Sequence, residues 1–444
     1  MKTILSKPTL LTLLVLCLFT SWTSAVEAAD TTKPNVVLII SDDQAWTDYG
    51  FMGHEAIKTP RIDKFASESA TYRRGYVPTA LCRPSLSTMA TGLYAHQHGV
   101  TGNDPSGRTN ELRARLIAKQ DTIDTIPKIL DQAGYVSHQS GKWWEGSWKR
   151  AGYTAGMTRG FPEPGGRHGD DGLQIGRNGM EPLFSFIDDA IEQEKPFFVW
   201  YAPFLPHTPH NPPERLLKKY EKEGRPESIA KYYAMCEWFD ETCGELLDKL
   251  DEKGVADNTI VLYVCDNGWI QDPNKVGRFA QRSKQTPYEG GIRTPIMVRW
   301  PGRVKPKMDA TTLVSSIDLL PTILDACGKD IPESLPGKSL IGDASGKEPL
   351  ERDAIYGEAF AHDIADIDDP TASLRCRWCI EGKWKLMLAH DGKLGAYGKM
   401  QTPLDPVMLF DLENDPHEKV NLAEKHPETV ADLTKKINDW WSID

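Results

Sequence analysis

The sequence predicts an α/β fold: a large, mixed and mostly parallel β-sheet sandwiched by helices, with a smaller C-terminal α+β subdomain of antiparallel strands and a terminal helix. Apolar runs rich in β-branched residues recur with helical patterns between them, as parallel strands and crossover helices do. After residue 335, short strand patterns follow one another without intervening helices, which is typical of an antiparallel sheet.

The elements follow in order along the chain. The apolar run at 35–40 predicts a buried strand, and Thr59 followed by Pro60 predicts a helix through residue 68, because Thr caps helices and Pro fits a first turn. Further strands of the large sheet are expected at 135–140, 196–202, 259–264 and 295–300, and further helices after residue 82 and at 126–133, 183–192, 228–253 and 316–326. The C-terminal strands are expected at 354–360, 374–381, 384–389 and 408–412, before a helix at 427–441.

Two segments stand outside this alternation. Residues 145–180 lack periodicity, which in a compact domain is typical of a functional loop or a lid. Pro332, Pro336 and Gly337 mark a linker, so we expect a main domain at 30–335 and a C-terminal subdomain at 336–444.

The N-terminus has the three parts of a secretory signal peptide. Lysines stand at positions 2 and 7, an apolar stretch covers 10–19, and small residues follow around Ala25 and Ala28. The apolar stretch is too short to span a membrane, and no other run is long enough. We therefore expect residues 1–29 to be cleaved from a protein that is secreted or periplasmic.

Composition excludes some classes of protein. The 444 residues carry a formal charge of −11, which argues against a nucleic-acid partner. Eight cysteines in so long a chain do not make a disulfide scaffold. Cys236 and Cys243 lie two turns apart on a predicted helix, too far for a bridge, and Cys376 and Cys379 are interpreted as ordinary cysteines of a strand.

Residues 81–92 predict a short loop that delivers Cys82 to the start of a helix. Pro84 suits a first helical turn, and Gly92 suits the position just past a helix end. The start of a helix favours anions and can activate a nucleophile. The alternative is a small buried cysteine beneath a helix cap.

Two strand ends carry oxygen ligands. Asp42 and Asp43 follow the strand at 35–40, and Asp266 and Asn267 follow the strand at 259–264. Open α/β sheets bind ligands at this carboxyl edge, and carboxylate with amide oxygens suits Ca²⁺ better than Mg²⁺. Each pair alone could equally be ordinary turn residues.

Cys82, Pro84, Ser85 and the following Thr91 and Gly92 resemble the signature of the type I sulfatases, in the alkaline phosphatase-like superfamily. In that family the cysteine is oxidised to formylglycine, so the resemblance implies a formylglycine-generating or anaerobic sulfatase-maturing enzyme as a partner. It also implies that residues 30–335 are the sulfatase catalytic domain, with Asp42, Asp43, Asp266 and Asn267 as its metal ligands.

Three further segments resemble the family. They are Gly141-Lys142-Trp143, Pro206-His207-Thr208-Pro209 and the run at 284–295 with its Tyr-Glu-Gly-Gly. The resemblance implies that Lys142 and Lys284 grip the sulfate oxygens while His207 assists departure of the sugar oxygen. The hydrated aldehyde would attack sulfur, and its second hydroxyl would then allow sulfate to be expelled.

Two residues depart from the family. Leu86 stands where the family has Arg, and Trp144 stands where it has His. We interpret both as one rebuilt wall of the pocket, so restoring either family residue alone is not expected to raise activity. His138 and His168 are candidates to replace the lost His, although a buried structural role is the alternative for His138.

The irregular loop offers substrate contacts. Trp144, Arg159, Arg167 and His168 combine aromatic faces, which stack on sugars, with groups that bind anions, so we expect a sulfated carbohydrate substrate. Alternatively, the tryptophans merely pack the loop. Two other functions remain open: a phosphonate or phosphodiester hydrolase of the same superfamily, and a non-catalytic homologue that binds sulfated glycans.

Overall fold

The computed structural model describes residue 3, residues 33–393 and residues 402–443. The expected signal peptide at 1–29 lies, apart from residue 3, outside the described residues. From Lys33 onward the described residues belong to one compact unit.

The large sheet has eight strands, and β1 lies near its centre. Their order across the sheet is β5 (Ala155–Gly156), β4 (Val136–Gly141), β6 (Phe197–Ala202), β1 (Asn35–Ser41), β7 (Thr259–Cys265), β8 (Arg293–Arg299), β2 (Ala70–Tyr76) and β9 (Lys307–Ser315). Neighbouring strands are parallel except at β8, which runs antiparallel to both β7 and β2. The predicted mixed, mostly parallel sheet is confirmed.

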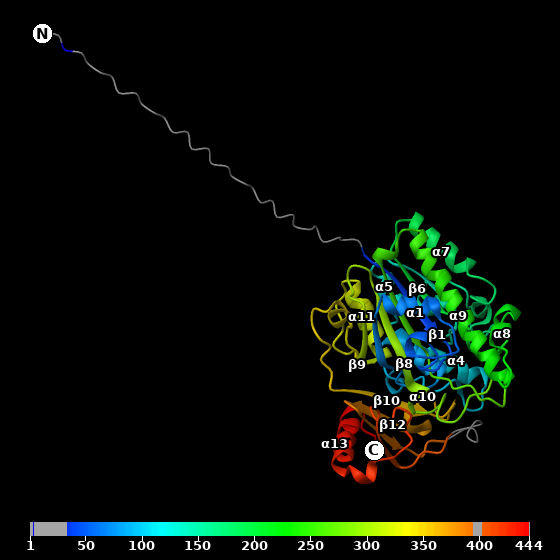
Figure 1. Cartoon of the computed structure of the whole chain (residues 1–444), viewed down its shortest axis with the longest axis vertical. Helices are drawn as coiled ribbons and strands as arrows, with labels where there is room; N and C mark the ends of the chain where they lie inside the picture. The colour runs from blue at the N-terminus through cyan, green and yellow to red at the C-terminus, as the bar shows by residue number, and fades with distance from the viewer. Residues whose placement is uncertain (1–2, 4–32, 394–401, 444) are drawn as a thin grey trace. The chain divides into compact units, whose positions relative to one another are not determined.

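Helices cover both faces of this sheet (Figure 1). Side chains of β1 alternate between the two cores: Val36 and Leu38 share a cluster with residues of α2 (Cys82–Thr91), α5 (Ile126–Asp131) and α11 (Leu319–Ala326). Val37 and Ile39 share the opposite cluster with residues of α1 (Pro60–Ser67), α7 (Glu181–Glu192) and α9 (Glu227–Glu252). Burial on both faces explains the continuous apolar run of β1.

A second sheet of four antiparallel strands forms the C-terminal part. Its order is β10 (Ala354–Phe360), β12 (Leu374–Glu381), β13 (Trp384–Ala389) and β14 (Val407–Asp411). The helix α13 (Pro427–Trp440) packs Leu433 and Ile437 against this sheet. This α+β arrangement was predicted, whereas the boundary at residue 335 stays a prediction.

Several elements were not predicted. The strand β2 contains Arg73 and Arg74, and β9 is an edge strand with exposed polar positions, so neither shows a continuous apolar run. The helices α4 (Asn110–Ala118) and α8 (Glu214–Tyr220) were also missed. Short elements complete the described chain: α3 (Ala95–His98), α6 (Trp148–Ala151), α10 (Glu289–Ile292), α12 (Ile341–Ser345), the paired strands β3 (Asp104–Pro105) and β11 (Asp363–Ile364), and the 3-10 turns Gly50–Met52, Asp170–Gln174, Ala256–Asn258, Ser316–Asp318, Pro370–Ser373 and Ala423–Lys425.

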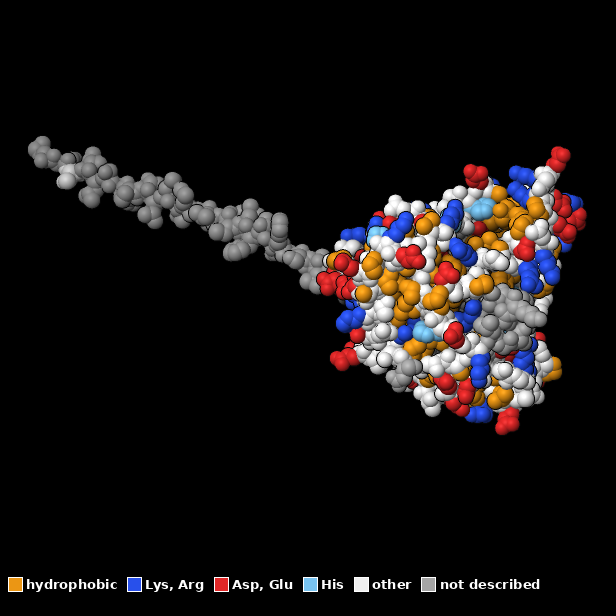
Figure 2. Space-filling view, turned by 90° about the horizontal axis from the view of Figure 1, so that it is seen from below, with side chains coloured by type: hydrophobic (Ala, Val, Ile, Leu, Met, Phe, Trp, Pro, Cys, Tyr) orange, Lys and Arg blue, Asp and Glu red, His pale blue; other side chains and the backbone are white. Residues whose placement is uncertain are grey.

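All seven described cysteines are free and buried. Cys376 and Cys379 lie on opposite faces of β12, one in the main core and the other beneath α13, as expected for ordinary strand residues. On the face drawn in Figure 2, Lys and Arg side chains are interspersed with Asp and Glu. Among the described residues, no helix is long and apolar enough to cross a membrane.

Candidate active site

Four oxygen-bearing side chains meet where β1 and β7 end: Asp42, Asp43, Asp266 and Asn267. Ser41 pairs with Cys265 in the parallel register, so the residues that follow are neighbours. The backbone N–H of Asp43 donates to Asp266 Oδ1 at 3.2 Å, and Asn267 Nδ2 donates to Asp43 Oδ1 at 2.6 Å. None of the four is more than 2% exposed, and the structure brings the predicted ligands into one cluster.

This cluster fits a hard cation. Asp43 Oδ2, Asp266 Oδ2 and Asn267 Oδ1 are buried and accept no hydrogen bond from the described residues, which is unusual inside a protein. Burial, together with the Asp266 carboxylate, raises the pKa of Asp42, and burial also raises the pKa of Asp266. A divalent cation would satisfy the three oxygens and offset the crowded negative charge.

Two lysines complete the cluster. Lys142 follows β4 and places Nζ 2.8 Å from both carboxylate oxygens of Asp42, while Lys284 pairs with Asp43. Burial disfavours the charge of each lysine, but the surrounding carboxylates outweigh it and raise both pKa values. Both ammonium groups are therefore charged at neutral pH. We call Asp42, Asp43, Asp266, Asn267, Lys142 and Lys284 the site floor.

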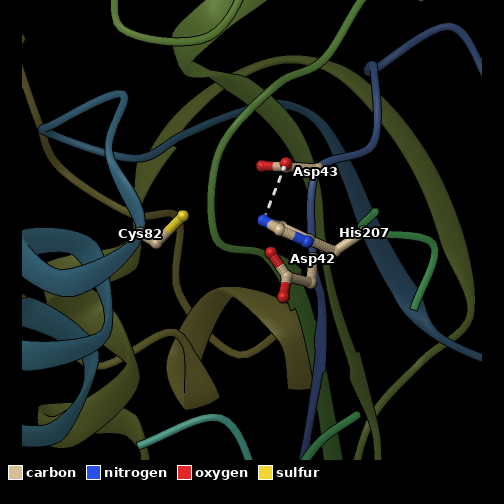
Figure 3. Close-up of side chains that lie close together, drawn as sticks. All are labelled: Asp42, Asp43, Cys82 and His207. Atoms are coloured by element: carbon tan, nitrogen blue, oxygen red, sulfur yellow. Dashed lines mark ion pairs between the residues drawn. The ribbon is translucent and has the colours of Figure 1, made fainter. Parts of the chain in front are cut away.

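Cys82 faces the site floor from the first residue of α2. One atom from each of Asp42, Asp43, Cys82 and His207 lies within 4.8 Å of the others, and Figure 3 shows the sulfur directed toward the two carboxylates. Lys284 Nζ donates to Cys82 Sγ at 3.0 Å. Burial nevertheless raises the pKa of Cys82 to about 12, so the helix start does not by itself activate the thiol.

His207 lies opposite Cys82, in the segment after β6. Its ring stacks on Phe204 at 4.1 Å, and Nε2 is 3.4 Å from Asp43 Oδ2. Nδ1 is 2.7 Å from the carbonyl oxygen of Thr208, which can only accept, so the neutral ring carries its proton on Nδ1. Burial, with the charges of Lys142 and Lys284, lowers the pKa of His207 well below its usual value.

One side of the site is built around Trp144, which is 4% exposed. Arg83 lies 5.9 Å from the Trp144 ring, and Arg167 lies 4.7 Å from it. Arg83 Nε and Nη2 each donate to Glu145 at 2.7 Å, and both of these side chains are only 3% exposed. We call Arg83, Trp144, Glu145, Arg167 and His168 the site wall.

The remaining contacts of the site wall are also internal. Arg167 pairs with Asp104. Burial would raise the pKa of Asp104, but the hydrogen bond from Arg167 and the charges of Arg167, Arg113 and Arg83 together outweigh burial and lower the pKa. His168 packs edge-on against Trp144 at 5.2 Å and stacks on Phe204 at 5.5 Å. Burial, together with the charge of Lys142, lowers the pKa of His168 to about 4, so its ring is neutral at neutral pH.

The two departures from the family pattern, Leu86 and Trp144, are buried on the same side of the large sheet. Leu86 is 2% exposed and belongs to the same apolar cluster as Cys82 and Trp144. Arg83, one turn earlier on α2, supplies the guanidinium of this region and directs it to Glu145. Arg83 and Glu145 thus form an internal ion pair beside Trp144.

Two other predicted positions lie apart from this cluster. Arg159 is half exposed and pairs with Asp171 at 3.2 Å. His138 packs against Phe186 of α7 at 5.1 Å, on the sheet face opposite the Cys82 cluster, so the structural interpretation of His138 agrees with its surroundings.

The sequence analysis did not name Arg83 and Glu145 of the site wall, and it also missed two residues in irregular segments, Phe204 and Asn103. Phe204 stacks on His207 and lies 5.3 Å from Lys142 Nζ, and Asn103 Oδ1 accepts the backbone N–H of Arg83 at 3.1 Å. Both lie in irregular segments, where no periodicity marks a side chain as buried. Only their neighbours offered a signal: Phe204 precedes the His207 segment by two residues.

Comparison with known proteins identifies the arrangement. The family model described as sulfatase matches residues 34–329, more than half of the chain. The chain belongs to the sulfatase family. A model of the C-terminal region of N-sulphoglucosamine sulphohydrolase also matches this sulfatase, at residues 277–441. The protein is therefore a sulfuric ester hydrolase with an alkaline phosphatase-like fold.

Relatives of this sulfatase are named for carbohydrate substrates. An ulvan-active sulfatase of Formosa agariphila is 26% identical and covers 91% of this chain and 81% of the relative. An N-acetylgalactosamine-6-O-sulfatase of Bacteroides thetaiotaomicron is 24% identical over 91% of this chain and 92% of the relative. The crystal structure of Ps i-CgsB with k-i-k-neocarrahexaose shares the fold, with a TM-score of 0.71, 22% identity and coverage of 93% and 94%.

Proposed function

We propose that this sulfatase hydrolyses sulfate esters of a carbohydrate, using formylglycine made from Cys82 and a divalent cation, Ca²⁺ in preference to Mg²⁺. One observation carries the proposal: two charged lysines lie among the carboxylates beside Cys82, together with three buried oxygens that accept no hydrogen bond from the described residues. A sulfate ester is an anion that needs positive charge around its oxygens. The buried thiol itself, with its pKa raised to about 12, is a poor nucleophile.

The site floor would bind both the cation and the sulfate group. Asp42, Asp43, Asp266 and Asn267 would hold the cation, which supplies positive charge to the sulfate oxygens. Formylglycine at position 82 would supply an oxygen nucleophile. Lys142 and Lys284 donate hydrogen bonds to the remaining sulfate oxygens and stabilise the charge that develops on them, while the surrounding carboxylates keep both lysines protonated.

His207 would serve the leaving group. Thr208 holds Nδ1, so Nε2 is the atom that faces the site. Because the lowered pKa leaves the ring neutral at neutral pH, Nε2 would first take a proton from water and then give it to the departing sugar oxygen, for which the lowered pKa makes the protonated ring a stronger acid than an ordinary histidine. The stack on Phe204 keeps the ring in this orientation.

The site wall supports a negatively charged glycan as the substrate. The face of Trp144 is shared with Arg167, whose side chain is 37% exposed and able to turn toward a carboxylate or a second sulfate. His168 closes the same wall, and Arg159 would contact a more distant part of the glycan. The carbohydrate names of the relatives agree with this substrate class.

Export and maturation belong to the same proposal. The pattern of residues 1–29 supports secretion or a periplasmic location, and a formylglycine-generating or anaerobic sulfatase-maturing enzyme would convert Cys82. Recovery of the native protein outside the cytoplasm, beginning near residue 30, is the expected result. Full-length protein in the cytoplasm would contradict it.

Mass spectrometry of the Cys82 peptide from a competent host tests the chemistry. Conversion of the thiol to an aldehyde removes ~18 Da, and this loss is expected to accompany activity. The matched control, Cys82→Ala, should show neither. Unmodified Cys82 in an active protein would refute formylglycine catalysis, and unmodified Cys82 in an inactive protein would favour the non-catalytic glycan-binding alternative.

Metal dependence and product identity complete the test. Chelation should abolish sulfate release from an aryl sulfate and from sulfated oligosaccharides, and Ca²⁺ should restore it better than Mg²⁺. The metal should also stabilise the protein, by about 2.7 kcal/mol at a hundredfold excess over its Kd. Faster release from phosphonate or phosphodiester analogues than from sulfate esters would instead indicate the second hydrolase function.

A further inference from the structure

A buried carboxylate outside the site, Glu418, lies between β14 and α13 and is 1% exposed. Its Oε1 is 2.8 Å from Nζ of Lys385, a residue of β13 with no exposed surface. The same ammonium group is 3.1 Å from Glu289 Oε1, at the start of α10. One lysine of the C-terminal sheet therefore bridges an acid of the C-terminal part and an acid of the main domain.

Glu418 also holds both ends of the segment 282–289. Arg282 Nη1 donates to the backbone carbonyl of Glu418 at 2.6 Å, at the start of the segment. At its end, the backbone N–H of Glu289 donates to Glu418 Oε2, also at 2.6 Å. Lys284 lies between these two anchors, and its Nζ reaches Cys82 Sγ at 3.0 Å.

The backbone of this region is one that its sequence would not adopt alone. Arg282, Gln285 and Glu418 have φ values of 54°, 66° and 56°, in the left-handed region that is unfavourable for residues other than glycine. Such conformations persist where surrounding contacts impose them, and they cluster at functional sites. The segment therefore depends on its anchors for its shape.

The charges of the anchor are balanced. Glu289 Oε2 accepts a hydrogen bond from Tyr76 Oη at 3.1 Å and lies 3.4 Å from Arg293 Nη1. Two acids thus face Lys385 and Arg293. Burial raises the pKa of Glu418 to about 7, while Lys385 and the Glu289 N–H favour its charged form. Removing one member would leave another buried charge without its partner.

A second buried ion pair provides the comparison. Arg352, just before β10, pairs with Asp318, and the two side chains are 7% and 0% exposed. It too joins the C-terminal part to the main domain. None of its described hydrogen bonds or ion pairs involves a residue of 282–289. If buried pairs served stability alone, both would affect the enzyme in the same way.

We propose that Glu418 is a positioning residue for the reaction: from the C-terminal part of the chain it clamps the segment 282–289 and so sets Lys284 Nζ against position 82 and the bound sulfate. This inference rests on the proposed function, because it takes Lys284 as a ligand of the sulfate group. It gives the C-terminal sheet a part in the chemistry in addition to its own packing.

The test compares Glu418→Ala and Arg282→Ala with the control Arg352→Met in the mature, metal-loaded enzyme. For each variant we would measure the kinetic constants for an aryl sulfate, the binding of inorganic sulfate by calorimetry and the melting temperature. Mass spectrometry would check that the formylglycine content is the same in all of them. Glu418→Ala should weaken sulfate binding and lower kcat/KM by tenfold or more, and Arg282→Ala by a smaller factor. Arg352→Met should lower the melting temperature yet keep both quantities within twofold of the wild type.

The outcomes separate the two proposals. Glu418→Gln keeps an acceptor for the Glu289 N–H and should therefore recover part of the sulfate affinity that Glu418→Ala loses. If Glu418 served only the stability of the fold, the two variants would bind sulfate equally well at temperatures where both are folded. The clamp would be refuted if folded Glu418→Ala kept its sulfate affinity and kcat/KM within twofold of the wild type. If Glu418→Ala does not fold, unchanged sulfate affinity and kcat/KM in Arg282→Ala would refute the clamp instead. A wild type without turnover would refute the proposed function, and the binding measurements would still test the clamp.

Discussion

The site floor and the site wall meet at Cys82, yet they differ in how far their buried polar and charged groups are satisfied by partners within the protein. In the site floor, three buried oxygens lack a donor among the described residues, and two lysines crowd against carboxylates. In the site wall, Arg83 and Arg167 are each paired with an acid and lie against Trp144. The site floor therefore needs a ligand to satisfy its buried oxygens, whereas the charged groups of the site wall are already paired within the folded protein. This difference supports the proposal that the site floor binds the cation and the sulfate group, while the site wall shapes the pocket and selects the substrate.

The largest effect is expected in the site wall. Arg83→Met leaves Glu145 buried without its partner and should lower the free energy of unfolding by about 3–5 kcal/mol. The double variant Arg83→Met/Glu145→Leu should recover most of this loss, because no unpaired charge remains. Denaturant unfolding measures both, with the exposed pair Arg150–Asp121 as the control, where Arg150→Met should cost less than about 1 kcal/mol. Similar losses for Arg83→Met and Arg150→Met would show that the wall is not self-contained.

A change in the site floor should affect turnover more than folding. Lys142→Ala removes one ammonium group from the sulfate oxygens and should lower kcat by about 10²–10³, or about 2.7–4 kcal/mol of transition-state stabilisation. Lys149→Ala, an exposed neighbour, should leave kcat unchanged. Steady-state kinetics on an aryl sulfate decides the matter, and a fall of less than tenfold would remove Lys142 from the chemistry.

His168 of the site wall should make the stability of the protein depend on pH. The pKa of His168 is lowered to about 4 in the folded protein, so the unfolded chain binds this proton first. The stabilisation is present above pH 6.5 and is lost as the pH falls toward 4. His168→Gln should therefore reduce the stability lost between pH 7 and 4 by about 2 kcal/mol, measured by denaturant unfolding at each pH.

His138 is the matched control for this effect, because burial lowers its pKa to about 4 as well. His138→Gln should flatten the same pH dependence yet leave the KM for sulfated oligosaccharides unchanged. His168→Gln should raise that KM. Equal effects of the two variants on KM would argue against a substrate-facing role for His168.

The smallest effect is expected at the rim of the wall. Arg167→Ala should raise the KM for a sulfated oligosaccharide that carries a second anionic group by about tenfold, or about 1.4 kcal/mol, and leave an aryl sulfate without a second anionic group unaffected. Arg215→Ala, in an exposed pair on α8, is the control and should change neither. An equal rise for both substrates in Arg167→Ala would mean that Arg167 supports the site rather than selects among glycans.

Sequence reasoning performed best where local chemistry and strand order are linked. The strands β1 and β7 could be predicted because strands buried on both faces are continuously apolar. Once both strands were parallel neighbours, the meeting of Asp42 with Asp266 followed from geometry. The start of α2 at Cys82 and its end before Gly92, with φ 67°, likewise followed from the preferences of Pro and Gly.

Edge strands and irregular segments were harder to predict. The first half of β9 is partly exposed and mixes polar with apolar residues, and β2 is interrupted by two arginines, so their pairing depends on the rest of the sheet. Phe204 and Asn103 lie in segments without periodicity, and nothing local marks them as part of a pocket. His138 and Lys142 are four residues apart, yet the turn at Gly141, with φ 83°, separates their surroundings.

The sequence by itself determined the central strands of the sheet, the carboxylates at their ends and the candidate nucleophile, because each depends on a short pattern of neighbouring residues, whereas the two lysines of the site floor came from the resemblance to the family. Only the tertiary structure decided the contacts between distant segments: Arg83 with Glu145 across 62 positions, and Glu418 with Glu289 across 129. Such a buried contact forms only where two distant segments pack against each other, and no local sequence pattern encodes which segments these are. The residues proposed to perform the reaction could therefore be named as candidates from the sequence, while those that hold and enclose them could not.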